Sequence, residues 1–158
     1  CGYRPGGAAF LSRSIKEAIG ELGWSFGSTY SGQKGALIAA KVSLDELEKN
    51  QYGLLCNARE MGALWSKDLA AGLLKEFPDK IICCNGTGLL QALVLNKNLD
   101  LNSVASALVS EGLLPFVFRH KQTQQIVYMI TPPLTIDKEA MVRIATSTAK
   151  ALHKLGSF

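Results

Sequence analysis

Residues 81–95 read IICCNGTGLLQALVL, two apolar runs on either side of the turn sequence NGTG at residues 85–88. Short runs of β-branched and other apolar residues around a glycine-containing turn are typical of a β-hairpin. The residues before them, up to Pro78, instead have apolar side chains at helical spacing. We therefore expect the chain to change here from helices to a sheet.

The sequence after this hairpin alternates between helical and strand patterns. Gly112 ends a helical pattern, and Thr131-Pro132-Pro133 ends a strand that follows the polar loop KQTQQ. The expected elements are a helix at residues 100–111, a second hairpin with strands at 115–119 and 126–130, and a last helix from Asp137 to about residue 155. Strands and helices in this arrangement predict an α+β lobe.

The first half of the chain is expected to be mainly helical. Ser14 and Glu17 have the spacing of a capping box, and Gly23 ends the helix that they begin. Further helices are expected from about Ala36 to Asn50, which interrupts the spacing, and from about residue 52 to residue 76. Residues 8–11 form a short candidate strand.

The string Gly27-Ser28-Thr29-Tyr30-Ser31-Gly32 places hydroxyl side chains and glycines directly before the helix expected from Ala36. A helix N-terminus has unpaired N–H groups and the positive end of the helix dipole, so it favours a phosphate group. The alternative from this string alone is an ordinary Ser/Thr-capped helix start.

The composition of the chain is that of a globular domain or of two small lobes. It has 158 residues, of which 47% are hydrophobic and 19% charged. No apolar run approaches the roughly 20 residues that span a membrane, and no secretory leader is visible. The net charge of +4 comes from scattered cations. Nucleic-acid binding would need a basic stripe with interleaved aromatic residues, so we expect no such partner.

The cysteines and histidines do not have the spacing of a metal site. Cys1, Cys56, Cys83 and Cys84 contain no CxxC pair, and His120 and His153 stand alone. Free thiols are typical of a reducing compartment, so we expect a cytoplasmic protein.

Several strings of this sequence resemble one family, the class III pyridoxal-phosphate-dependent aminotransferases, which include the ornithine, acetylornithine and 4-aminobutyrate enzymes. They occur in the order and at the spacing of the family over nearly the whole chain, which makes them specific together although each is weak alone. The strings are residues 2–8 (GYRPGGA), 27–32 (GSTYSG), 57–62 (NAREMG), 86–89 (GTGL), 111–114 (EGLL) and 131–136 (TPPLTI).

The resemblance implies the C-terminal portion of a fold-type I transferase, with α/β and α+β parts. Residues 1–75 would be the end of the large cofactor-binding domain and its connecting helices, and residues 76–158 the small α+β domain. In such enzymes the glycine-serine-threonine string reaches into the partner subunit and binds the cofactor phosphate. That role falls here on Ser28 and on the side chain of Thr29, which implies pyridoxal 5'-phosphate as cofactor and a homodimer with shared active sites.

The sequence also departs from the family. The family's Schiff-base lysine lies just before the GYRPGG string, so its counterpart would precede Cys1, and this chain by itself is expected to be inactive. Gln33-Lys34 and Asn85 stand where other residues are usual in the family. Met129 stands where amino-acid-specific members have an arginine that binds the substrate carboxylate. Either the substrate has no carboxylate there, or Arg119 or a residue outside the chain binds it.

The function that the resemblance implies is amino-group transfer between an amine or amino-acid donor and an oxo-acid or aldehyde acceptor. Two alternatives remain open at this point. One is a pyridoxal-phosphate-dependent aminomutase or decarboxylase on the same scaffold, and the other is a non-catalytic remnant that serves dimerisation or binding.

Overall fold

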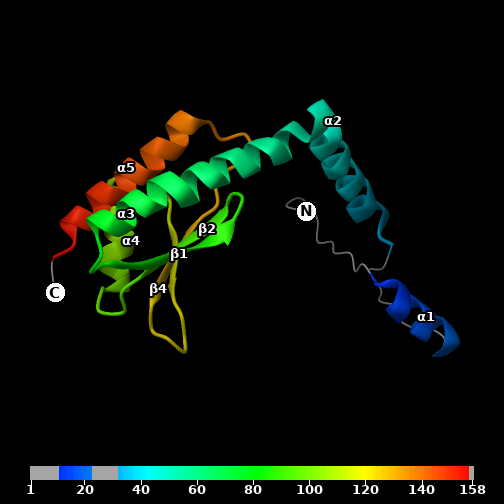
Figure 1. Cartoon of the computed structure of the whole chain (residues 1–158), viewed down its shortest axis with the longest axis horizontal. Coiled ribbons are helices and arrows are strands. Elements are labelled where there is room, and N and C mark those ends of the chain that lie inside the picture. Colours follow the sequence, from blue (N-terminus) through cyan, green and yellow to red (C-terminus); the bar gives the residue numbers. More distant parts are fainter. Residues whose placement is uncertain (1–10, 23–31, 157–158) are drawn as a thin grey trace. The chain divides into compact units, whose positions relative to one another are not determined.

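The computed structural model describes residues 11–22 and 32–156. Two compact units are present, and the boundary between them follows Gly53. The elements (Figure 1) are α1 (Arg13–Leu22), α2 (Lys34–Leu64), the π-helical turn η1 (Trp65–Leu69), α3 (Ala70–Glu76), β1 (Ile81–Thr87), β2 (Leu90–Leu95), α4 (Leu101–Ser110), β3 (Phe116–Arg119), β4 (Ile126–Ile130) and α5 (Lys138–Lys154). The candidate strand at residues 8–11 lies almost entirely outside the described residues.

The strands of the second unit form a four-stranded antiparallel sheet in the order β1-β2-β4-β3. Each predicted hairpin supplies two neighbouring strands of the sheet. Thr87 lies opposite Leu90 in the first hairpin, and Arg119 lies opposite Ile126 in the second. The hairpins join where Leu93 of β2 lies opposite Tyr128 of β4. The α+β fold expected from the alternation of strands and helices is therefore confirmed.

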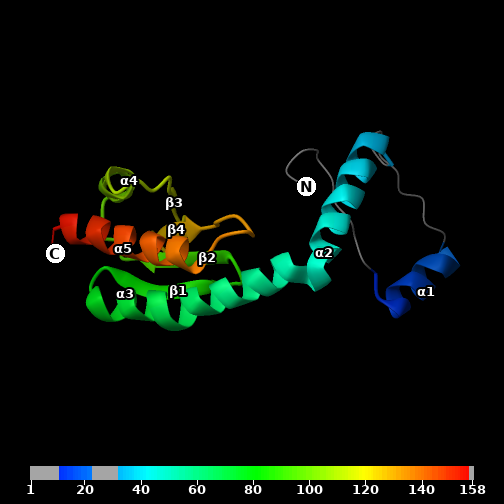
Figure 2. The same cartoon turned by 90° about the horizontal axis from the view of Figure 1, so that it is seen from above.

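The core of this unit lies between one face of the sheet and its helices. Alternate residues of β2 and β4 are buried, as expected for strands with one face in the core. Helices α3 and α5 lie along the sheet in Figures 1 and 2. The buried helical residues include Trp65, Ala70, Leu73, Val104, Leu108, Met141, Ala145, Thr148 and Leu152.

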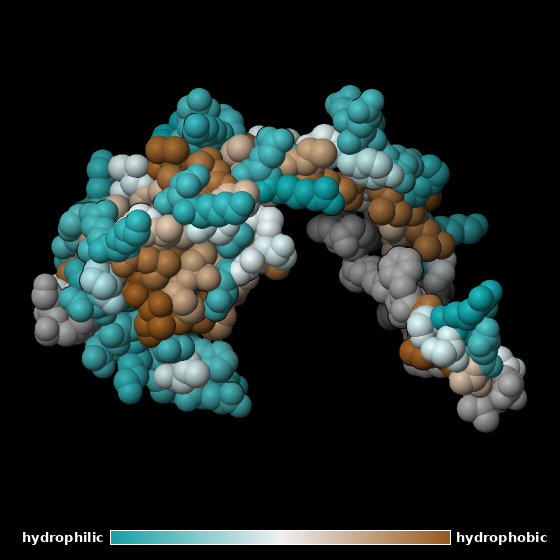
Figure 3. All heavy atoms as spheres, in the orientation of Figure 1, coloured by the Kyte–Doolittle hydropathy of each residue, from teal (hydrophilic) through white to brown (hydrophobic). Residues whose placement is uncertain are grey.

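The opposite face of the sheet, here called the outer face, is apolar and largely uncovered among the described residues. Leu90 is 56% exposed and Phe116 is 63% exposed. Figure 3 shows apolar side chains gathered over the part of the second unit that holds the sheet. Cross-strand pairing places these residues on the outer face: Cys83, Asn85, Thr87, Leu90, Ala92, Val94, Phe116, Phe118, Val127 and Met129.

The interruption predicted at Asn50 is confirmed as a break inside α2. Asn50, Gln51 and Tyr52 have φ values of 51°, 55° and 62°. This left-handed region is uncommon for residues other than glycine, although Asn tolerates it better than most. Helical geometry resumes after the break and continues to Leu64.

The helix expected at residues 52–76 is divided by the π-helical turn η1. Trp65 and Ala70 are five residues apart, and both side chains are completely buried. A π-turn contains more residues than an α-turn, so it brings side chains at this spacing onto one face.

The division between the two expected domains, at about residue 75, stays a prediction. In this chain, the compact unit that contains the sheet already begins at Leu54, because η1 and α3 pack on α5 and β1.

Candidate functional site

The predicted phosphate contacts, Ser28 and Thr29, lie outside the described residues and stay predictions. The helix that follows them is described, and α2 begins at Lys34, close to the expected start. The Gln33 carbonyl accepts hydrogen bonds from the backbone N–H groups of Ala36 (3.0 Å) and Leu37 (3.1 Å). The first turn of α2 contains no acidic side chain. No negative side chain in this turn would repel an anion such as phosphate, but the N–H groups of Ala36 and Leu37 are already paired with Gln33.

Met129 lies on the outer face of the sheet, in the third of its four strands. It pairs with Ala92 of β2 on one side and with Phe116 of β3 on the other. A pocket of ≈ 400 Å³ opens on this face and has no charged residue in its wall. Its lining residues are Asn85, Gly86, Thr87, Leu90, Gln91, Ala92 and Met129. This wall provides nothing comparable to the guanidinium that would bind a carboxylate.

Arg119, the residue of this chain named above as a replacement for the family arginine, forms hydrogen bonds elsewhere. Its Nη1 donates hydrogen bonds to the carbonyls of Lys97 (3.0 Å) and Gln124 (2.6 Å), and its Nη2 donates to the carbonyl of Leu99 (2.9 Å). These bonds tie β3 to the loop before α4 and to the turn of its own hairpin. Arg119 therefore has a structural role, which the sequence did not reveal because its partners are backbone atoms.

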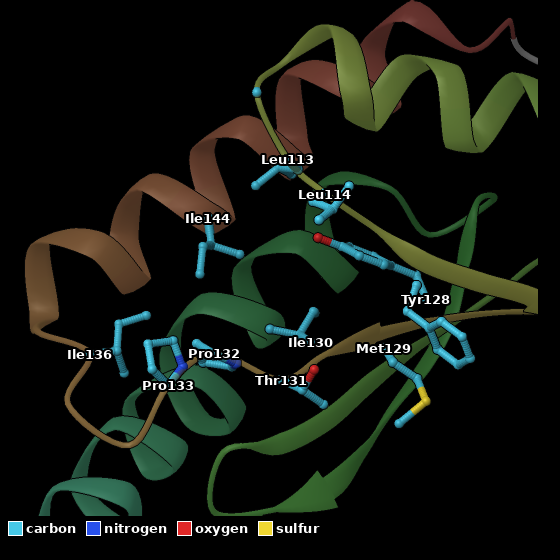
Figure 4. Close-up of a pocket in the computed structure, with 12 residues that line it drawn as sticks. Leu113, Leu114, Tyr128, Met129, Ile130, Thr131, Pro132, Pro133, Ile136 and Ile144 are labelled. Carbon is cyan, nitrogen blue, oxygen red and sulfur yellow. The ribbon is translucent and has the colours of Figure 1, made fainter. Parts of the chain in front are cut away.

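A second pocket, of ≈ 280 Å³, lies between β4, α5 and the residues around Leu113. Figure 4 shows Tyr128 pointing toward that side of β4, whereas Met129 points away from it. Pro132, Pro133 and Ile136 form part of the wall. Burial raises the pKa of the Tyr128 hydroxyl, which stays protonated and neutral at physiological pH.

Two of the family-like strings meet where α2 crosses the turn between β1 and β2. A Cβ atom added at Gly62 would lie 2.2 Å from the carbonyl oxygen of Gly88, so only glycine allows this approach. Gly88 itself has a φ of 52°, and the Gln91 side chain donates to its carbonyl at 2.8 Å. The NAREMG and GTGL strings therefore have a packing role here.

The described cysteines and histidines form no metal site. No group of three or more His, Cys, Asp or Glu side chains in the described ranges could hold a metal ion. Nε2 of His153 lies 2.8 Å from a carboxylate oxygen of Glu76, and its ring packs edge-on against Phe77. Burial raises the pKa of the Cys84 thiol, which lowers the fraction present as thiolate, the reactive form. Nor is any helix of the described part long and apolar enough to cross a membrane.

Comparisons with known proteins place this combination of fold and motifs among pyridoxal-phosphate-dependent aminotransferases. The chain is 30% identical over 157 residues to a putrescine aminotransferase of Pectobacterium atrosepticum, covering 98% of this chain and 32% of that protein. It is 33% identical over 127 residues to a probable mitochondrial ornithine aminotransferase of Caenorhabditis elegans, covering 80% of this chain and 27% of that protein. No family model matches the chain.

A solved structure agrees with these relatives. The ornithine aminotransferase of Toxoplasma gondii, described with partial occupancy of pyridoxal phosphate at its active site, is 28% identical and superposes with a TM-score of 0.66. The superposition covers 80% of this chain and 28% of that chain. The resemblance to class III pyridoxal-phosphate-dependent aminotransferases is thus confirmed. The chain spans about a third or less of the length of these curated relatives.

Proposed function

We propose that the whole protein is an aminotransferase whose amino donor has no carboxylate at the position that faces Met129, such as a diamine or another terminal amine. The observation that carries this proposal is the uncharged outer face around Met129, together with the engagement of Arg119 by three carbonyls. A carboxylate against a wall without a cationic partner loses much of its solvation energy, whereas a methylene chain is stabilised by the apolar side chains of that wall.

The names of the relatives are divided on the donor. One is a putrescine aminotransferase, and putrescine is a diamine without a carboxylate. Two others are named ornithine aminotransferases, and ornithine has a carboxylate. The wall around Met129 favours a donor without a carboxylate, because its polar side chains, Asn85, Thr87 and Gln91, are uncharged and it has no basic side chain. All three are named as aminotransferases, which favours amino-group transfer over a mutase, a decarboxylase or a non-catalytic remnant.

In this proposal the chain contributes the cofactor's phosphate contact in a homodimer. Thr29 would bind the phosphate of pyridoxal 5'-phosphate through its hydroxyl and Ser28 through its backbone N–H, across the subunit interface. The helix start at Lys34 supports this role, since its first turn adds no negative charge. When bound, pyridoxal phosphate supplies the electron sink for amino-group transfer, and its Schiff-base lysine would come from outside this chain.

The test of the donor class uses the full-length parent protein with pyridoxal phosphate and an oxo-acid acceptor. We expect kcat/KM for a diamine such as putrescine to exceed that for ornithine by about tenfold or more, since one lost charge-assisted contact has an effect of this order. Product amino acid is measured by chromatography, and the isolated 158-residue chain, which we expect to be inactive, is assayed in parallel. A preference for ornithine, or no transfer at all, contradicts the proposal.

The phosphate role predicts that Thr29→Val weakens cofactor binding in the parent. Valine has the shape of threonine without the hydroxyl, so the Kd for pyridoxal phosphate should rise about 10- to 100-fold, measured by fluorescence titration. Thr146→Val is the matched control, because the Thr146 hydroxyl bonds only to the Val142 carbonyl of its own helix. Equal effects of the two variants contradict the role of Thr29.

The cross-subunit part of this role has its own test. A hybrid dimer pairs one Thr29→Val subunit with one subunit that lacks the Schiff-base lysine. If Thr29 acts across the interface, the lysine of the first subunit meets the intact Thr29 of the second, and one active site is restored. If Thr29 acts within its own subunit, the hybrid keeps only the low activity of the parental variants.

A further inference from the structure

The side chain of Asn57, in α2, connects that helix to the segment that joins β4 to α5. Its Nδ2 donates one hydrogen bond to the carbonyl of Leu134 at 2.7 Å and another to the carbonyl of Ile136 at 2.9 Å. Both protons of one amide group are thus used on two carbonyls of a segment more than 70 residues away in the sequence. No charge is involved, so the contact depends on the direction of the N–H bonds.

The segment of residues 131–136, here called the strap, has few hydrogen bonds of its own. Pro132 and Pro133 have no backbone N–H, and cross-strand pairing ends at Ile130 opposite Gln91. Among the described residues, the strap's other backbone hydrogen bond runs from the N–H of Ile136 to the carbonyl of Pro133 (3.0 Å). The Asn57 side chain therefore supplies most of the hydrogen bonds that hold the strap.

The strap forms one wall of the pocket beside β4. Thr131, Pro132, Pro133 and Ile136 line this pocket, and the strap follows directly after Met129 and Ile130 (Figure 4). Asn57 does not line it. On the other side, Ala58 and Met61 of α2 pack against the core, and Gly62 lies against the turn before β2. These packing contacts fix the position of this part of α2, so the hydrogen bonds from Asn57 can hold the strap in place.

We infer that Asn57 is a positioning residue that sets the place of the strap, and through it the shape of the ≈ 280 Å³ pocket between β4 and α5. This role does not rest on the proposed function, because the donor is placed at the other pocket, on the outer face of the sheet.

The test is hydrogen exchange of the full chain with Asn57→Asp and Asn57→Ala. Aspartate keeps the shape of asparagine but turns acceptor oxygens toward two carbonyl oxygens. We expect the buried amide of Ile136, which donates to the Pro133 carbonyl, to exchange about tenfold faster in both variants. Asn96→Asp is the matched control, since it removes the bond of Asn96 Nδ2 to the Asp79 carbonyl (3.1 Å) and leaves the strap alone. Unchanged exchange in the strap overturns the inference, whatever the enzyme does.

Discussion

Replacing Gly62 with alanine is expected to lower the free energy of unfolding by about 3 kcal/mol, at the upper end of the cost of overpacking a well-packed site. The new methyl carbon would lie 2.2 Å from the Gly88 carbonyl oxygen and 2.5 Å from its carbon, both backbone atoms. Backbone atoms cannot rotate away like the end of a side chain, so α2 or the β1–β2 turn must shift. In thermal unfolding followed by circular dichroism, Tm should fall by about 10 °C.

Gly72→Ala is the matched control for this prediction. Gly72 also lies in a helix, α3, but a Cβ atom there meets nothing within 4 Å. Alanine is a better helix former than glycine, so this variant should be unchanged or more stable by about 0.5–1 kcal/mol. Equal losses in both variants would show that the contact between α2 and the β1–β2 turn is not what makes Gly62 necessary.

Replacing Met129 with arginine in the full-length parent is expected to change its donor preference. The variant places a planar guanidinium on the uncharged outer face, where it can form two parallel hydrogen bonds with a carboxylate. The ratio of kcat/KM for ornithine to kcat/KM for putrescine should rise about 10- to 100-fold, which corresponds to about 1.4–2.8 kcal/mol of differential binding. Steady-state kinetics with each donor separately measures this ratio.

Two further variants separate charge from geometry at this position. Met129→Leu keeps the wall apolar and should leave the ratio unchanged. Met129→Lys adds a charge without the planar fork, so it should raise the ratio less than Met129→Arg does. If the ratio of kcat/KM for ornithine to kcat/KM for putrescine is unchanged in Met129→Arg, residue 129 does not face the donor. The proposal of a donor without a carboxylate would then have no structural basis.

The elements of the sheet unit were predictable because their signals are local. A turn sequence between apolar runs specifies a hairpin whatever surrounds it, and both hairpins lie within a few residues of their expected positions. The starts of α4 and α5 follow from Asp100 and Asp137, which accept hydrogen bonds from the N–H groups of Ser103 (2.8 Å) and Ala140 (2.7 Å). The bond to Ser103 also lowers the pKa of the Asp100 carboxyl.

The candidate site was only partly predictable from the sequence. The family-like strings identified the class of protein and the residue, Met129, at which the chain departs from amino-acid-specific members. They did not show that Arg119 donates hydrogen bonds to three backbone carbonyls, which argues against it as a replacement for the family arginine. The phosphate contacts at Ser28 and Thr29 stay predictions that rest on the sequence alone.

Local sequence thus determined the order of the helices and strands, the caps and breaks between them, and the resemblance to aminotransferases. Tertiary structure decided the rest: the engagement of Arg119, the placement of Met129 on an uncharged face, the need for glycine at position 62 and the hold of Asn57 on the strap. Caps and turns act between residues close together in the chain, so a sequence pattern reveals them. A contact such as that from Asn57 to Ile136 depends on the directions of two backbones that only the packed fold brings together.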